Sequence, residues 1–280
     1  MPKLKPNQFY LPCGPLLTEL PILFQTEMVQ CIITGRKTQT RRTRGLNLVN
    51  LTPDIFKYED STIYKNHVFR AYGYEDTIGG IVPGHLFIPS PFGKPGDLLW
   101  VKETWSNLNG DFPQADPYIV FKSDLDHPNQ HGPVTWKPSI HMPKEASRIW
   151  LMVEDIRVER LQEISEEDAI AEGIAIVKDR NEDRERYANY YYYGQEEYEE
   201  WQFVHGTDLP KFSFYSLWAS INGEKSWNAN PWLWVIQFRV LSTTGNPSLE
   251  IIEKNYLEVT NPPRVLEPLE GSGRKEDSNE

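Results

Sequence analysis

The stretch RIWLMVEDIRVERLQEISEEDAIAEG, residues 148–173, decides the fold class because its periodicity changes partway along. Residues 148–158 begin with a solid apolar run and then alternate, as a strand does when it leaves a core for the edge of a sheet. Ser165 follows as a good helix N-cap, acidic residues crowd the positive first turn, and Gly173 can end the helix. A strand that leads directly into a capped helix predicts an α+β fold.

Similar patterns predict further elements on both sides of this stretch. Thr26 is expected to cap a helix, and Gly35 to stop it in a left-handed conformation. Apolar residues at helical spacing, Met28, Val29, Ile32 and Ile33, give that helix a buried face. The other predicted elements are a central strand over 98–105, a helix over 212–221 and a strand over 232–240.

The remaining segments are predicted to be peripheral to one domain over residues 21–245. Residues 1–20 are rich in proline and are expected to form an irregular arm. Two insertions are expected, one at about 43–90 with one or two strands and one at about 176–210. Residues 246–280 form a polar extension whose tail is expected to be disordered.

Composition limits the classes of function. The 280 residues are 39% hydrophobic and 12% aromatic, which is ample for a folded core. A formal charge of −11 argues against a protein that binds long nucleic-acid duplexes through contacts with many phosphates. Residues 151–200 hold sixteen Asp or Glu against six Lys or Arg, so most of the excess charge lies there. The rest of the chain is close to neutral, and a local basic site remains possible.

The cysteines and the apolar runs bear on compartment and cofactors. Cys13 and Cys31 have no paired spacing, so neither a disulfide framework nor a zinc site is suggested. The N-terminus lacks the apolar run of a signal peptide, and no stretch approaches the roughly 18 apolar residues that would span a bilayer. We therefore expect a cytoplasmic protein with no membrane partner, no metal and no other cofactor.

A basic segment directly after the first predicted helix is the first candidate site. Residues 35–44 contain five cations and no acid. They could form a solvated loop that complements the negative helix end. They could also form a site in which Lys37 is a point charge and Thr40 a nucleophile or hydrogen-bonding group. The second interpretation requires a lowered amine pKa, from burial or from a neighbour such as Arg36, and a turn that brings both side chains to one face.

Glu172 is the second candidate. It is the last residue before Gly173, at a helix end where the dipole disfavours a carboxylate. Such a position suits either a frayed, solvated side chain or a group for proton transfer. Glu103 could line a pocket or face solvent, and His141 and Arg148 could meet phosphate or ribose or lie in a surface loop.

Four separated motifs occur together in this chain: GRKTQTRR (35–42), KPGDLLWVKETW (94–105), residues 148–173, and NPWLWVIQF (230–238). In this order they resemble the ASCH-domain family of the PUA-like superfamily, in its longer bacteriophage and prophage versions. The resemblance covers residues 21–42, 91–174 and 212–240, about half of the chain. It implies a β-barrel related to the PUA fold with flanking helices and large loop insertions.

The resemblance also implies a site. Some small members of the family are amidohydrolases that remove the acetyl group of N4-acetylcytidine, and their catalytic Lys, Thr and Glu are matched here by Lys37, Thr40 and Glu172. The substrate, a nucleoside or single-stranded RNA, would be bound by further polar residues: Arg36, Arg41, Arg42, Glu103, His141 and Arg148.

Several functions remain open at this point. The leading hypothesis is an amidohydrolase acting on N4-acetylcytidine or a related modified nucleoside, free or in RNA. Its rivals are a non-catalytic protein that captures a single-stranded or modified base, a nuclease, and a phage protein that binds a host factor. A host protein would be bound through the acidic, Tyr-rich segment 176–202, which is otherwise expected to be a mobile lid.

Overall fold

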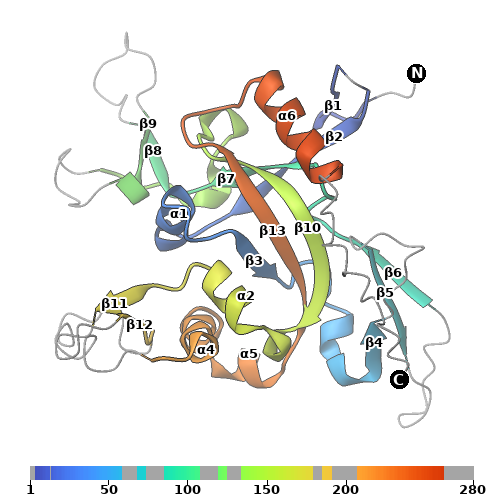
Figure 1. Ribbon diagram of the computed structural model, residues 1–280, viewed down its shortest axis with the longest axis vertical. Coiled ribbons are helices and arrows are strands. Elements are labelled where there is room, and N and C mark those ends of the chain that lie inside the picture. Colours follow the sequence, from blue (N-terminus) through green and yellow to red (C-terminus); the bar gives the residue numbers. More distant parts are fainter. Residues whose placement is uncertain are drawn as a thin grey trace, which may run out of the picture.

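The computed structural model describes residues 4–12, 14–58, 68–73, 85–107, 119–124, 134–178, 185–190 and 207–261. They form an α+β fold around one six-stranded mixed sheet (Figure 1). Only the pair β2 and β7 is parallel among its neighbouring strands. The strands, in their order across the sheet, are β1 (Gln8–Tyr10), β2 (Leu16–Leu23), β7 (Leu98–Lys102), β10 (Trp150–Arg160), β13 (Trp232–Ser242) and β3 (Gln39–Arg42).

The long antiparallel pair β10 and β13 forms the centre of the sheet. Within β10, only Trp150 to Met152 pair with β7, so the first part of β10 lies between two strands and is apolar on both faces. The second part has β13 as its partner, and its buried and half-buried residues alternate. The predicted strands over 148–158 and 232–240 are therefore confirmed. The strand predicted over 98–105 ends at Lys102.

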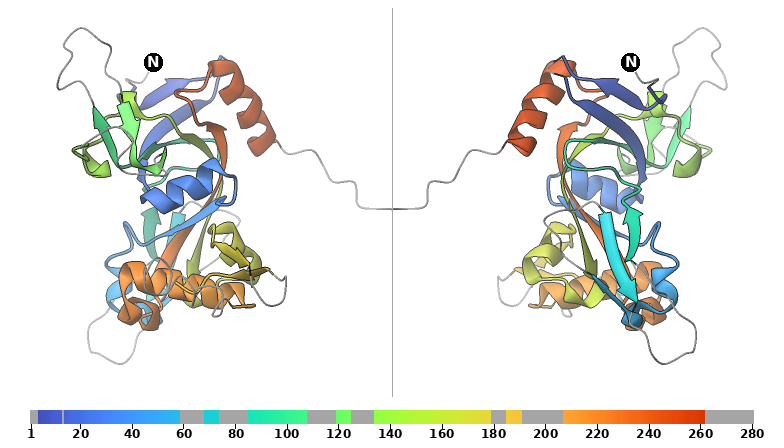
Figure 2. Two further views of the ribbon diagram at one scale, coloured as in Figure 1. Left: turned by 90° about the vertical axis from the view of Figure 1, so that its left-hand side faces the viewer. Right: turned by 90° about the vertical axis from the view of Figure 1, so that its right-hand side faces the viewer.

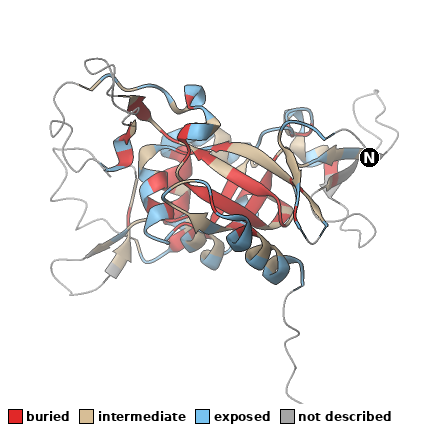
Figure 3. Ribbon diagram, turned by 90° about the horizontal axis from the view of Figure 1, so that it is seen from above, coloured by how far each residue is buried: buried red, intermediate tan, exposed pale blue. Residues whose placement is uncertain are grey.

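Each face of the sheet has its own core, because neighbouring side chains of a strand point to opposite faces. Leu151 and Val153 pack with Trp234 and Phe238 on the inner face. Trp150 and Met152 point the other way, to a cluster that includes a residue of helix α6 (Leu249–Thr260). Figure 3 shows the buried residues concentrated along these central strands.

A second group of helices lies at the opposite end of the molecule from α6 (Figure 2). It contains α2 (Glu166–Ala171), α4 (Pro210–Asn222) and α5 (Glu224–Asn228). Leu161, Ile164, Phe214 and Leu233 pack together there. Short 3-10 turns connect other parts of the chain: η1 (Val49–Leu51), η2 (Pro53–Ile55), η3 (Lys122–Asp124), η4 (Ser139–His141), η5 (Lys144–Ala146) and η6 (Leu161–Glu163).

The sheet curls so that its edge strand β3 faces the end of β2. The Arg42 guanidinium donates a hydrogen bond of 2.7 Å to the carbonyl oxygen of Leu23, and the ring of Phe24 lies 6.2 Å from that of Phe238 on β13. No backbone ladder joins β2 to β3 among the described residues, and β1 and β3 remain the two edges. The described strands thus form an open, curled sheet, and a closed barrel is not shown.

Helix α1 (Thr26–Ile33) differs from its prediction at its start. Gln25 is the N-cap, without a side-chain hydrogen bond, and Thr26 is the first helical residue. The hydroxyl of Thr26 therefore does not cap the helix. Ile33 is 40% exposed, and Cys31 is buried in its place. Gly35 has a φ of +74° just after the helix, as predicted.

Both ends of the chain contribute regular structure that the sequence patterns did not predict. Residues expected to form an irregular arm make β1 and the first part of β2, where Leu17 is fully buried. α6 lies in the polar extension and buries Ile252 against the sheet. Residues 262–280, which include the predicted disordered tail, lie outside the described residues.

The two expected insertions also contain strands. β4 (Phe56–Tyr58), β5 (Val68–Gly73) and β6 (His85–Pro89) form a three-stranded antiparallel sheet in the first insertion, where one or two strands were predicted. In the second, β11 (Ile176–Lys178) pairs with β12 (Glu185–Tyr187). Outside both insertions, β8 (Trp105–Asn107) pairs with β9 (Ile119–Phe121).

Only part of the acidic segment 176–202 can be compared with its prediction as a lid. Ala188 is 1% exposed, and its carbonyl oxygen accepts a hydrogen bond from Ser213 of α4. This part packs on α4, whereas residues 179–184 and 191–202 lie outside the described residues. None of the helices in the described ranges is long and apolar enough to cross a membrane.

Candidate functional site

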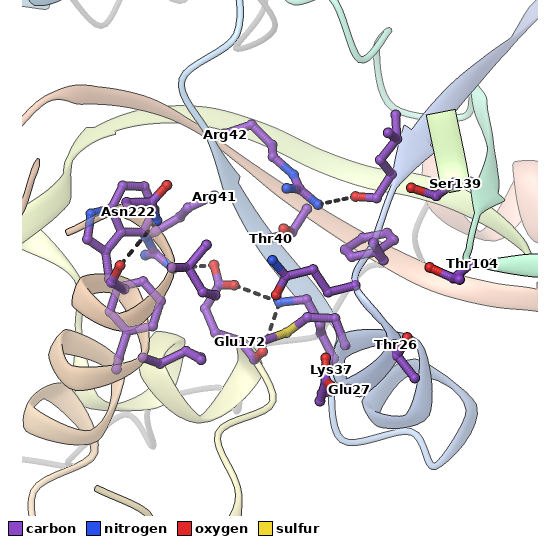
Figure 4. Close-up of a pocket in the computed structure, with 18 of the residues that line it drawn as sticks. Thr26, Glu27, Lys37, Thr40, Arg41, Arg42, Thr104, Ser139, Glu172 and Asn222 are labelled. Carbon is purple, nitrogen blue, oxygen red and sulfur yellow. Dashed lines mark hydrogen bonds and ion pairs between the residues drawn. The ribbon is translucent and has the colours of Figure 1, made fainter. Parts of the chain in front are cut away.

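A cavity of about 580 Å³ lies between the end of β2, the first turn of α1, β3 and α4 (Figure 4). Small-molecule sites in proteins are roughly 300–1,000 Å³ in volume. Lys37, Thr40 and Glu172 all line this cavity, as predicted from the sequence. Its other walls combine aromatic rings, including Phe24 and Trp218, with hydroxyl and amide groups.

The backbone between α1 and β3 explains how Lys37 reaches this cavity. After Gly35 the chain turns, and the Lys37 N–H bonds to the carbonyl oxygen of Cys31. The next N–H, of Thr38, bonds to the carbonyl oxygen of Ala171 at the end of α2. Lys37 therefore lies outside the regular strand, and this turn meets the geometric condition that the sequence left open for Lys37 and Thr40.

Lys37 and Glu172 form a buried ion pair although 135 positions separate them. The ammonium Nζ lies 2.7 Å from Glu172 Oε2 and 2.8 Å from the Glu172 backbone oxygen. The two side chains are only 3% and 6% exposed. Burial lowers the pKa of Lys37, and the attraction of Glu172 opposes this effect. The pair thus places an amine of reduced basicity at the cavity wall.

Gly173 permits this close approach. Its φ is +84°, a conformation that side chains rarely adopt, and it ends α2 directly after Glu172. A Cβ atom there would lie 2.8 Å from the Cβ of Lys37 and 3.1 Å from that of Cys31. A glycine is therefore required by both the backbone and the packing.

Arg41 holds the other oxygen of the Glu172 carboxylate. It is 4% exposed, and its Nη1 lies 3.0 Å from Glu172 Oε1. Its Nη2 lies 3.0 Å from both Glu159 and Asp168, and Arg157 also bonds to these two carboxylates. The resulting network contains three cations and three carboxylates: Lys37, Arg41, Arg157, Glu159, Asp168 and Glu172. This balance of charge allows the network to be largely buried.

Thr40 is a buried residue whose hydroxyl makes no hydrogen bond within the described part of the chain. It is 3% exposed and pairs through its backbone with Ile236 of β13. Its side chain lines the same cavity as Lys37 and Glu172 (Figure 4). A ligand in the cavity could therefore accept a hydrogen bond from this hydroxyl or be attacked by it.

Arg42 differs from Arg41 in its charge environment. Its cationic carbon lies 4.9 Å from the centre of the Phe24 ring, and no carboxylate among the described residues pairs with it. Its Nε is buried without a hydrogen-bond partner. Burial lowers the pKa of Arg42, with an opposing attraction from Glu172. The Arg42 guanidinium thus has hydrogen-bonding capacity that the described protein does not use.

Four residues expected to bind substrate do not line this cavity. Arg36 is exposed and bonds to the hydroxyl of Thr34, and His141 is exposed in η4. Glu103 is 1% exposed and accepts two hydrogen bonds of 3.0 Å from Arg148. Glu103 and Arg148 are therefore hydrogen-bonded to each other, away from the cavity.

The cavity also contains residues that the sequence did not indicate. Phe214, Leu217 and Trp218 were predicted only as the apolar face of a helix, and that face extends through Asn222 into the cavity wall. Thr104 lies between β7 and β8, while Lys122 and Ser139 begin η3 and η4, and the positions of all three depend on tertiary packing. Among the described residues, no group of three or more His, Cys, Asp or Glu could hold a metal ion.

Comparison with known proteins adds no relative. No family model, no curated protein and no solved structure matches the chain.

Proposed function

We propose that this protein is an amidohydrolase that deacylates N4-acetylcytidine or a related modified nucleoside, and that it is a long member of the ASCH family. The observation that carries this proposal is the convergence of Lys37 and Thr40, from the basic segment, with Glu172, from the end of α2, on one cavity of suitable volume. In this proposal the curled sheet is the open form of the PUA-like barrel that the resemblance implies.

Thr40 is the nucleophile in the proposed reaction. Its hydroxyl oxygen adds to the amide carbonyl carbon, and the C–N bond to the cytosine N4 breaks. The hydroxyl proton passes to Lys37 when its amine is in the neutral form, and then to the leaving nitrogen. Water hydrolyses the resulting acetyl ester, which releases acetate and restores Thr40. The lowered pKa of Lys37 supports this role, because only the neutral amine can accept a proton.

Glu172 and Arg41 prepare the site in this mechanism. Glu172 holds Lys37 through one carboxylate oxygen, while Arg41 holds the other oxygen. A carboxylate fixed on both sides can accept a hydrogen bond from a bound base, or take the proton from Lys37 and pass it to the leaving amine in place of a direct transfer from Lys37. The aromatic rings of Phe24 and Trp218 offer apolar surface for a flat ring.

Binding without catalysis is the second candidate. The ion pair of Lys37 with Glu172 and the aromatic rings of the cavity wall would serve equally to capture a modified or single-stranded base. A host-factor surface at residues 176–202 stays a prediction, since most of that segment lies outside the described residues.

Incubation of the full chain with N4-acetylcytidine tests the proposal. We expect cytidine and acetate to appear in equal amounts in the wild type, and the Thr40→Ala variant to bind the nucleoside without releasing acetate. Saturable binding with no acetate release in the wild type would support the binding-only alternative. Absence of both binding and release would exclude this nucleoside as the ligand.

A further inference from the structure

The charged groups around the cavity are distributed unequally between its two ends. At one end, Lys37 and Arg41 are neutralised by Glu172 and by the carboxylates behind it. That end offers directed hydrogen bonds and little net charge, which suits an uncharged polar group such as an amide or a base.

The other end carries positive charge that the described protein does not neutralise. Arg42 has no carboxylate partner in the described ranges, and its Nε is buried without a hydrogen bond. Lys122 is exposed and likewise lacks an ion pair within the described chain. Among the described residues that line the cavity, Glu27 is the only carboxylate outside the network, and it is exposed.

The uncharged groups at this second end are hydrogen-bond donors. Thr104 and Ser139 line the side of the cavity opposite Arg41 and Glu172 (Figure 4). The first turn of α1 also lines the cavity, and its N-cap Gln25 supplies no side-chain cap. The free N–H groups of a helix start favour anions.

We infer that this second end binds a phosphate group, so that the ligand is a nucleotide or a nucleotide within a strand. The inference rests on the proposed function, which places the base at the neutral end. A planar guanidinium with free donors is well suited to phosphate oxygens. The ring of Phe24 under Arg42 keeps this fork in a fixed orientation beside the cavity.

Calorimetric titration of the full chain with cytidine, its 5′-monophosphate, its 3′-monophosphate and inorganic phosphate tests the inference. We expect one monophosphate to bind about tenfold or more tightly than cytidine, as a charge-assisted hydrogen bond provides. Arg42→Gln should remove most of this gain and leave the affinity for cytidine nearly unchanged. Inorganic phosphate should bind weakly, and its binding should weaken further as salt is added.

Arg44→Gln is the matched control, because Arg44 is exposed, lies two residues away and does not line the cavity. This variant loses the same charge as Arg42→Gln and should still bind the monophosphate more tightly than cytidine. If Arg42→Gln fails to fold, Lys122→Gln tests the inference instead, because Lys122 is exposed. This variant should reduce the gain in affinity of the monophosphate over cytidine by about threefold.

The outcomes separate the two proposals. Cytidine that binds with no gain from either phosphate overturns this inference and leaves the proposed function standing. The inference is also overturned if a folded Arg42→Gln variant still binds the monophosphate as much more tightly than cytidine as the wild type does. If Arg42→Gln does not fold, the same result with Lys122→Gln overturns it. Failure of cytidine and both monophosphates to bind contradicts the proposed function and the inference together.

Discussion

Gly173 is the residue on which the contact between Lys37 and Glu172 depends. A methyl group there would meet the side chains of Lys37 and Cys31 at 2.8 and 3.1 Å, in a backbone of φ +84°. Gly35 follows α1 as Gly173 follows α2 and has a similar φ, +74°, but nothing lies within 4 Å of the position of its missing Cβ. The two glycines therefore separate the cost of packing from the cost of the left-handed conformation.

Gly173→Ala should lower the free energy of unfolding by about 1–3 kcal/mol more than Gly35→Ala, because overpacking adds to the conformational strain that both changes introduce. Urea denaturation of the two variants measures this difference. Equal losses would show that the backbone conformation alone requires glycine at position 173.

Lys37 and Thr40 act as one unit in the proposed mechanism. Each alanine variant should therefore lower kcat for N4-acetylcytidine by at least about 10²-fold, and the double variant should lose little more than either single one. Steady-state kinetics of the three variants test this. Losses that multiply would mean that the two residues contribute independently.

At the scale of elements, Asp168 joins α2 to β3 and β10 through Arg41 and Arg157. Burial raises the pKa of Asp168, but the two guanidinium groups outweigh this effect, so the pKa lies below its usual value. A carboxyl whose pKa is lowered by folding stabilises the protein at pH values above its pKa in the unfolded chain, about 3.9. This stabilisation is lost as the pH falls through the pKa of the carboxyl in the folded protein.

The wild type should accordingly be more stable than Asp168→Asn at pH 7, and this advantage should shrink as the pH falls from about 4 toward 2. Unfolding free energies of both proteins across this range provide the measurement. An advantage that is constant with pH would show that the charge of Asp168 does not anchor α2.

α6 is an element that the sequence analysis did not predict, although its pattern was readable. Ser248 caps the helix, and Ile252, Tyr256 and Val259 recur on one face, which packs against the outer face of the sheet. The polar residues between them led to the prediction of a polar extension. Strong periodic segments such as 150–160 and 232–242 were predictable, because burial on both faces of a central strand leaves a continuous apolar run.

Alanine substitutions at Ile252 and at its neighbour Ile251 measure how much α6 contributes to the free energy of unfolding. Ile252 is 3% exposed and Ile251 is 41% exposed. Ile252→Ala should lower the free energy of unfolding by about 2–5 kcal/mol, as cavity-forming substitutions do, and Ile251→Ala by less than about 1 kcal/mol. Comparable small effects at both positions would mean that α6 is not part of the cooperative fold.

At the scale of the whole molecule, the cavity lies where the curled sheet remains open between β2 and β3. Arg42 crosses this opening to Leu23, while α1 and α4 form its walls. The basic run and the carboxylate before Gly173 made Lys37, Thr40 and Glu172 candidates, and the resemblance to the ASCH family implied that they form one site. Sequence spacing could not show that Arg148 donates hydrogen bonds to Glu103, since this pairing depends on how distant segments pack.

Chemical trapping of an acetyl group on Thr40 tests the central claim most directly. The wild-type chain is mixed with N4-acetylcytidine, quenched within a turnover and digested, and the peptides are examined by mass spectrometry. The account predicts an acetyl ester on Thr40 that is absent from the Thr40→Ala variant, together with release of cytidine. Release of cytidine with an acetyl group on another residue, or at the wild-type rate by Thr40→Ala, would contradict the account.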